Sequence, residues 1–171
     1  MSAAETPLSA EEARAQTRRM AMELLDVCDR TVREMRERLA RRGCPAEAVD
    51  AVVADLEAVH LLDDRAFVRR WVESRRQRRP EGAPKIVMDL VRRRIDREVI
   101  AEVLAELDAD LGSQDEALAL LRRQRARYER LDETTAQRRM LGMLARRGFG
   151  ADTACSAAAR VWAEIETGSQ G

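Results

Sequence analysis

The sequence predicts an all-α protein in which one three-helix unit is used three times. Three segments share a pattern: an apolar residue, a leucine four positions later, and a helix-ending residue after four more. They read Met35-x3-Leu39-x3-Gly43, Ile86-x3-Leu90-x3-Arg94 and Met140-x3-Leu144-x3-Gly148. Positions 35, 86 and 140 are 51 and 54 residues apart, and such a period is typical of a repeated helical unit. Apolar and polar residues do not alternate and β-branched residues do not cluster for long, so no strand is predicted.

Each of the three units is expected to be only marginally stable alone. Aromatic residues make up 3% of the 171 residues, and much of the 45% apolar content is alanine. A unit of about 50 residues buries a small share of its surface, so we expect stacked neighbours to support one another. The units also correspond after the motif, at two sets of positions: Val49, Ile100 and Ala154, and Leu56, Leu107 and Val161.

The first unit is predicted to span residues 18–61 and to follow a flexible segment at 1–17. That segment is polar and rich in Ala and Glu. Ser9 and Glu12 nevertheless have the spacing of a capping box, which could start a short helix there. The first helix of the unit is expected from about 18 to 29.

Turn chemistry sets the next boundaries in this unit. Thr31 and Glu34 form a capping box that starts the second helix. Gly43 ends it, because glycine readily adopts the left-handed conformation at the end of a helix. Pro45 suits the first turn of the third helix, where its missing N–H loses no hydrogen bond. Arg94 stands where the other units have glycine, so the second unit either turns differently or tolerates a strain of about 1 kcal/mol or more.

The second unit is predicted at 62–112 and the third at 113–166. Asp63 can cap the first helix of the second unit, and Pro80 and Gly82 end that helix. A capping box of Ser113 and Glu116 opens the third unit. Its helices are expected at 113–130, 134–147 and 151–166, followed by a disordered tail at 167–171.

The sequence offers no catalytic, metal or cofactor site. The three cysteines, Cys28, Cys44 and Cys155, are odd in number and far apart, which argues against a disulfide framework or a zinc site and fits a reducing compartment. The one histidine, His60, could be paired with Asp63 or Ser74, but nothing orients it, and we interpret it as a helix-terminal residue. No apolar run reaches transmembrane length, so a cytoplasmic protein is expected.

Charge is balanced in total but alternates in blocks along the chain. The 31 basic and 31 acidic residues give a net charge of zero. Residues 65–97 carry 12 basic and 4 acidic residues, and residues 122–147 carry 9 and 3. Between them, residues 98–121 carry 7 acids and no base. Such blocks favour a protein with one face that attracts anions, although solvated helix faces tied by i,i+4 pairs give a similar pattern.

Arginines of the two basic blocks are the candidate binding residues. On a helical wheel, Arg69, Arg70 and Arg76 point away from the apolar stripe of Phe67 and Trp71. Arginine far outnumbers lysine, which suits bidentate recognition of phosphate or carboxylate but also fits a GC-rich genome. The predicted set is Arg69, Arg70, Arg76, Arg79, Arg92 and Arg93 in the second unit, and Arg122, Arg123, Arg125 and Arg127 in the third.

Several segments resemble the RecX family of recombinase regulators. They are the run from Leu61 to Phe67 (LLDDRAF), the run from Trp71 to Arg75 (WVESR), and Gly82. The flanking REMRERLARRG, which ends at Gly43, and LARRGF, which ends at Phe149, also match. The likeness extends from about residue 21 to 165, nearly the whole predicted fold. The chain departs from the family at Arg94, where glycine is usual, and at Val87–Met88, where the family is more polar.

The resemblance implies a fold and a partner. The fold would be three tandem three-helix units in an elongated, curved arrangement. The partner would be RecA, the bacterial strand-exchange recombinase, in its filament on single-stranded DNA. Members of the family inhibit the ATPase, strand-exchange and coprotease activities of RecA, and no catalytic residue or cofactor is carried over. Both groove binding and filament capping stay open, as does direct contact with DNA, and we expect a monomer.

Two other functions are compatible with the same residues. Short three-helix units with a basic helix can act as helix-turn-helix DNA-binding regulators, although no unit has an evident recognition helix. A helical-repeat scaffold that binds another protein without nucleic acid is the second alternative. An enzyme is the least favoured, and it would depend on His60.

Overall fold

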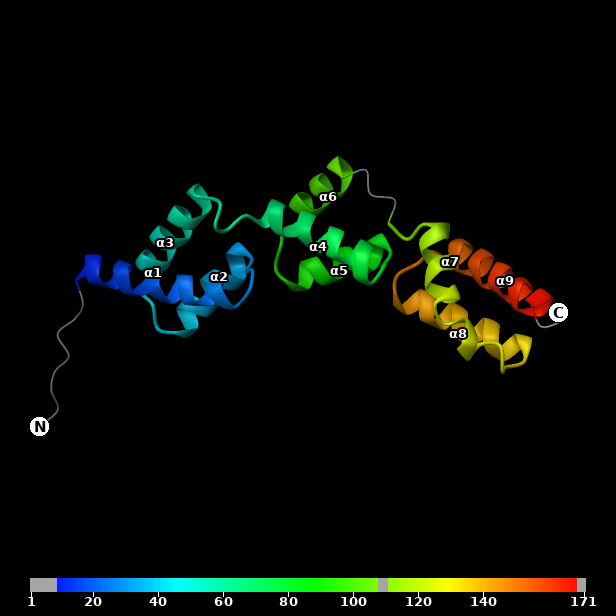
Figure 1. Ribbon diagram of the computed structural model, residues 1–171. Coiled ribbons are helices and arrows are strands. Elements are labelled where there is room, and N and C mark those ends of the chain that lie inside the picture. The colour runs from blue at the N-terminus through cyan, green and yellow to red at the C-terminus, as the bar shows by residue number, and fades with distance from the viewer. Residues whose placement is uncertain (1–8, 108–110, 169–171) are drawn as a thin grey trace, which may run out of the picture. The chain divides into compact units, whose positions relative to one another are not determined.

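In a computed structural model of the chain, residues 9–107 and 111–168 are described, and within these ranges every regular element is a helix (Figure 1). The all-α prediction is therefore confirmed. The helices are α1 (Ala10–Val27), α2 (Val32–Arg41), α3 (Ala46–Ala58), α4 (Asp64–Arg78), α5 (Ala83–Arg92), α6 (Arg97–Glu106), α7 (Gln114–Arg122), α8 (Glu133–Arg146) and α9 (Ala151–Gly168), with a short 3₁₀ turn at Arg125–Arg127.

Contacts divide the chain into two compact units. The first comprises the described residues up to Val68 together with Leu90–Val103, and the second comprises Arg69–Asp89 together with the described residues from Leu104 onward. In the first unit α1, α2 and α3 pack on one another, and in the second α7 and α8 pack on α9. The unit boundary falls inside α4, so a compact unit does not coincide with a predicted sequence unit.

The repeated motif forms the centre of the fold. Met35, Ile86 and Met140 are each 0% exposed, and so are Leu39, Leu90 and Leu144. Burying one such side chain contributes about 1.5–3 kcal/mol. Of the other corresponding positions, Leu107 differs because it follows the end of α6 and is half-buried. The buried ones are Val49, Ile100, Ala154, Leu56 and Val161.

The helix end after the motif has one geometry in all three copies. Gly43, Arg94 and Gly148 have φ of +80°, +67° and +78°. Each donates its N–H to the carbonyl three residues earlier, and the following residue donates to the leucine of the motif, at 3.2–3.3 Å. This is the Schellman pairing that satisfies the last carbonyls of a helix. Arg94 therefore tolerates the strained conformation and makes the same turn as the glycines.

Backbone strain at these turns should be measurable. We expect Gly43→Ala to destabilise the protein by about 1 kcal/mol, because a Cβ there meets no atom within 4 Å and only the left-handed conformation opposes it. Arg94→Gly should stabilise by about 0.5 kcal/mol, since relieved strain exceeds the added entropy of the unfolded chain. Urea unfolding followed by circular dichroism measures both.

Arg42→Gly is the matched control for these turns. Arg42 lies next to Gly43 with φ of −84°, so glycine relieves no strain there and should only destabilise. Equal effects of glycine at positions 42 and 94 would contradict the strain at Arg94.

Three predicted boundaries are wrong. α1 begins at Ala10 instead of 18, because Ser9 and Glu12 form the capping box, Ser9 N donating to Glu12 Oε2 at 2.9 Å. The predicted flexible segment 1–17 is thus helical from Ala10 onward, and residues 1–8 lie outside the described ones. The first helix of the third unit ends at Arg122, not near 130, and the 3₁₀ turn that follows leads into the buried Tyr128. α9 continues to Gly168, and the rest of the predicted tail, 169–171, lies outside the described residues.

None of the described helices is both long enough and apolar enough to cross a lipid bilayer.

Candidate anion-binding surface

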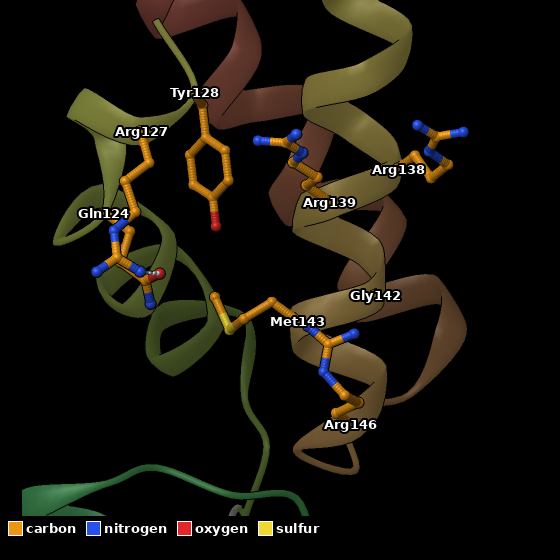
Figure 2. A pocket seen from close by; sticks show the side chains of 8 residues that line it. All are labelled: Gln124, Arg127, Tyr128, Arg138, Arg139, Gly142, Met143 and Arg146. Carbon is orange, nitrogen blue, oxygen red and sulfur yellow. Dashed lines mark hydrogen bonds between the residues drawn. The ribbon is translucent and has the colours of Figure 1, made fainter. Parts of the chain in front are cut away.

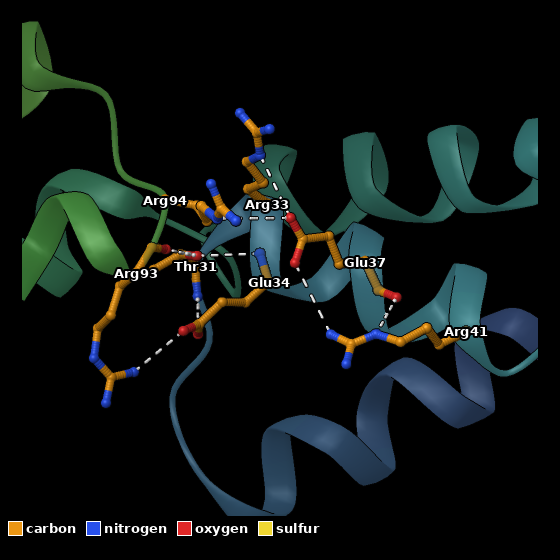
Figure 3. A network of polar contacts seen from close by, with 7 residues as sticks. All are labelled: Thr31, Arg33, Glu34, Glu37, Arg41, Arg93 and Arg94. Atoms are coloured by element: carbon orange, nitrogen blue, oxygen red, sulfur yellow. Dashed lines mark hydrogen bonds and ion pairs between the residues drawn. The ribbon is translucent and has the colours of Figure 1, made fainter.

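In the first compact unit, the turn between α5 and α6 docks onto the start of α2 (Figure 3). The Thr31 hydroxyl donates to the carbonyl oxygen of Arg93 at 2.9 Å. The Arg93 guanidinium lies 3.4 Å from Glu34, and its Cζ lies 5.5 Å from the centroid of the Phe67 ring. The N–H of Val32 is satisfied by Asp64 Oδ1 at 2.9 Å. Arg93 therefore ties α5 to α2 and α4 within this unit.

In the second compact unit, the turn between α8 and α9 docks onto the residue that precedes α5. Gly82 N donates to the carbonyl oxygen of Arg147 at 2.8 Å. A Cβ on Gly82 would lie 2.0 Å from the carbonyl oxygen of Gly148, and one on Gly148 would lie 2.6 Å from Cβ of Lys85. The two backbones thus meet where no side chain fits.

The two junctions share one kind of hydrogen bond. In each, the accepting carbonyl belongs to the residue before the left-handed one, Arg93 before Arg94 and Arg147 before Gly148. A hydroxyl donates in the first junction and a backbone N–H in the second. The corresponding turn at Gly43 differs, because none of the described atoms lies within 4 Å of a Cβ placed there.

A buried carboxylate lies beside the second junction. The Glu81 side chain is 4% exposed, and its oxygens lie 3.6 Å from Arg75 Nε and 3.7 Å from Arg79 Nε. Arg75 also stacks on Trp71, with Cζ 4.5 Å from the ring centroid. Burial lowers the pKa of Arg147, as does repulsion from Arg79, whereas Glu81 raises it. Glu81 is therefore the counter-charge of an arginine cluster.

Five of the six predicted arginines of the middle helices, Arg69, Arg70, Arg76, Arg79 and Arg92, are exposed, and Arg93 is half-buried. Arg69 pairs with Glu106 at 2.7 Å, Arg79 lies beside Glu81, and Arg93 binds Glu34. The helical wheel thus placed Arg70 and Arg76 correctly on the solvent side. The helical wheel did not reveal these carboxylates, because Glu106 and Glu34 lie on other helices and Glu81 lies in the loop between α4 and α5.

The four predicted arginines of the third unit divide similarly. Arg122 makes a bidentate pair with Glu164, with Nε at 3.0 Å and Nη2 at 2.5 Å. Arg125 binds Glu129 at 2.6 Å and the carbonyl oxygen of Glu164 at 3.2 Å. Arg123 and Arg127 are exposed, and none of the described carboxylates lies within 4.0 Å of either.

Arg127 lines a hollow of about 380 Å³ that sequence reasoning missed (Figure 2). Arg138, Arg139 and Arg146 of α8 line it too; Arg139 extends toward Tyr128, whereas Arg138 extends away from Tyr128. The spacing of seven residues between Arg139 and Arg146, two helical turns, was the available signal that they share a face. The hollow adds cations from α8 to the predicted patch.

The sequence matches the family description "RecX, first three-helix domain" over residues 18–56 and "RecX, second three-helix domain" over residues 63–104. A regulatory protein RecX from Mycobacterium avium is 37% identical over 142 residues, which cover 82% of this chain and 81% of that protein. The chain belongs to the RecX family. The regulatory protein RecX of Mycobacterium tuberculosis H37Rv is 36% identical over 154 residues, 87% of each chain.

Solved RecX structures share the helical fold. The crystal structure of RecX from Lactobacillus salivarius has a TM-score of 0.75 at 18% identity and covers 88% of this chain and 97% of that one. A second crystal structure of a regulatory protein RecX has a TM-score of 0.70 at 19% identity and covers 87% of this chain and 78% of the other. The hollow beside α8 lies in the part of the chain that follows both matched RecX domain descriptions.

The single histidine of this RecX chain follows a helix end. His60 ends α3 with φ of +57°, is largely exposed, and has Nδ1 3.8 Å from Asp63. The N–H of His60 bonds to the Glu57 carbonyl, so His60 is the helix-terminal residue that the sequence suggested. Among the described residues, no group of three or more His, Cys, Asp and Glu side chains could hold a metal ion.

Proposed function

We propose that this protein binds the RecA recombinase filament on single-stranded DNA and inhibits its ATPase, strand-exchange and coprotease activities. It would thereby regulate homologous recombination, DNA repair and the SOS response. Membership of the RecX family, across more than four fifths of the chain, is the observation that carries the proposal. The named relatives are regulatory proteins, which supports a regulatory role for this chain.

The distribution of arginines supports an anionic partner. Arg70, Arg76 and Arg92 are exposed on the middle helices, and Arg123 and Arg127 are exposed near α7. The filament carries phosphates, which guanidinium groups recognise by paired hydrogen bonds. The proposed surface also includes five arginines that contact carboxylates or carbonyls of this chain: Arg69, Arg79, Arg93, Arg122 and Arg125.

The protein would act as a cytoplasmic monomer without a cofactor and without an activity of its own. Titration of RecA-catalysed ATP hydrolysis on single-stranded DNA tests this proposal. Inhibition well below one molecule per RecA subunit would indicate capping of the filament end, and inhibition that requires about one molecule per subunit would indicate binding along the filament. No inhibition at any ratio would refute the proposal, and sequence-selective binding to duplex DNA without RecA would favour a transcriptional regulator instead.

Charge reversal should weaken this inhibition. We expect Arg70→Glu combined with Arg76→Glu to raise the half-inhibitory concentration about tenfold or more, because both exposed cations would become anions facing an anionic partner. The matched control reverses Arg19 and Arg38, which are equally exposed on α1 and α2. The same shift in the control would show that net charge alone is responsible, and unchanged inhibition by a folded Arg70/Arg76 variant would remove this patch.

A further inference from the structure

The hollow in the second compact unit concentrates positive charge without internal compensation. Arg127 reaches it from the 3₁₀ turn, and Arg139 and Arg146 reach it from α8 (Figure 2). None of the described carboxylates lies within 4.0 Å of these three guanidinium groups. Arg122 and Arg125, in the same part of the unit, are both paired with glutamates. Charge left unpaired in a concave place favours an external anion.

Neutral groups complete the hollow. Arg127 is steadied by the side-chain oxygen of Gln124, which accepts from Nη1 at 3.1 Å and leaves its charge uncompensated. The phenol oxygen of Tyr128 points into the space between the arginines (Figure 2). Burial raises the pKa of Tyr128, although Arg127 and Arg146 lower it, so the hydroxyl keeps its proton and can donate. The lining therefore presents hydrogen-bond donors around one small volume.

The hollow is open at its floor because one lining residue, Gly142, has no side chain. Gly142 lies in the interior of α8, where glycine is about 1 kcal/mol less favourable than alanine. It lines the hollow one turn from both Arg139 and Arg146, and a Cβ there would lie 3.2 Å from Nη1 of Arg146. The absence of a side chain at this position keeps the floor of the hollow open.

We propose that this hollow binds the phosphodiester backbone of a single-stranded nucleic acid. The proposal rests on the proposed function, since it assigns to the third helical unit direct contact with the strand inside the filament. Guanidinium groups pair with phosphate through two parallel N–H···O bonds, and a nucleic acid strand brings one such anion with every nucleotide. An acidic polypeptide would have to supply carboxylates in succession to match the same three cations.

The test measures binding of the full chain to a fluorescein-labelled oligothymidylate, by anisotropy across a series of salt concentrations and without RecA. Neutralising the hollow with Arg127→Gln, Arg139→Gln and Arg146→Gln should weaken binding about tenfold or more and reduce the slope of log K against log salt by about 2, since each phosphate contact on a single strand contributes about 0.7. The control neutralises Arg123, Arg130 and Arg160, three exposed arginines of the same region that do not line the hollow.

Gly142→Leu tests the hollow without changing charge. A leucine would fill the floor and should lower the affinity severalfold, while its better helix propensity keeps α8 folded. Equal losses in the hollow and control triples, or undiminished binding by both the triple and Gly142→Leu, would overturn the site. Polyglutamate is the comparison probe. If the triple variant no longer binds polyglutamate but still binds oligothymidylate, the hollow binds an acidic protein surface and the proposal is wrong.

The outcome can be separated from the proposed function. RecA inhibition by the unaltered chain is measured in its own assay, and strand binding is measured with no RecA present. If the unaltered chain inhibits RecA but the substitutions in the hollow do not change oligothymidylate binding, only this site is refuted. Strand binding through the hollow without RecA inhibition would refute the proposed function alone.

Discussion

Gly82→Ala should unfold the second compact unit at a much lower urea concentration than the unaltered chain. The added Cβ would meet the carbonyl oxygen of Gly148 at 2.0 Å, a distance at which the two backbones must separate. Their separation also breaks the hydrogen bond from Gly82 N to the Arg147 carbonyl. Overpacking and loss of a buried hydrogen bond together should destabilise by about 3–4 kcal/mol.

Tryptophan fluorescence measures this effect selectively. Both tryptophans of the chain, Trp71 and Trp162, belong to the second unit. Gly150→Ala is the control, because Gly150 also immediately precedes a helix and a Cβ there would lie 4.0 Å from the Thr153 hydroxyl oxygen. We expect less than about 1 kcal/mol from the control. Equal midpoints for the variants at 82 and 150 would show that the close approach of the two backbones is not what holds the junction.

Glu81→Gln should have the second largest effect, a loss of about 3 kcal/mol. The substitution keeps the shape of the side chain but removes the negative charge beside Arg75 and Arg79. Removing one partner from a buried ionic cluster leaves the others uncompensated, and this is strongly destabilising. The pKa of Arg147 is already lowered by burial and by Arg79, and the substitution would remove the Glu81 charge that raises this pKa.

Salt distinguishes the buried cluster from surface pairs. Glu73→Gln on the exposed side of α4 is the control and should change stability by about 0.5 kcal/mol or less. High salt should abolish the small loss of unfolding free energy caused by Glu73→Gln. It should leave most of the loss caused by Glu81→Gln, because buried charges are screened less. A Glu81→Gln variant as stable as the unaltered chain would mean that the arginines are adequately solvated without it.

Local sequence signals predicted much of the fold. The capping box at Thr31 and Glu34 is present, and Gly43 and Gly148 end their helices in the left-handed conformation. These signals work because they involve residues a few positions apart. The start of α1 differs from the prediction, because the capping box of Ser9 and Glu12 starts a helix inside a segment whose polar composition predicts flexibility. The end of α7 carries no glycine or proline, so no local signal marked it.

The candidate surface was harder to predict because it depends on tertiary neighbours. Charge blocks predicted two basic regions, but several arginines in them pair with carboxylates that lie far along the chain. Arg122 binds Glu164, which is 42 positions away. Arg139 and Arg146 belong to the same basic block but are not among the predicted binding residues. Only the packing of α8 beside the 3₁₀ turn brings them to the hollow. Periodicity could place a residue on a face, but it could not say what that face meets.

The left-handed turns have a consequence for where the chain can be cut. Thr31 and Asp64 of the first compact unit connect α2 with residues that lie beyond the first sequence repeat. A fragment ending at residue 61 would lack Asp64 and Arg93, leaving the Val32 amide and the Glu34 carboxylate without their acceptor and cation. A fragment that keeps these contacts must therefore be longer than the period of the sequence.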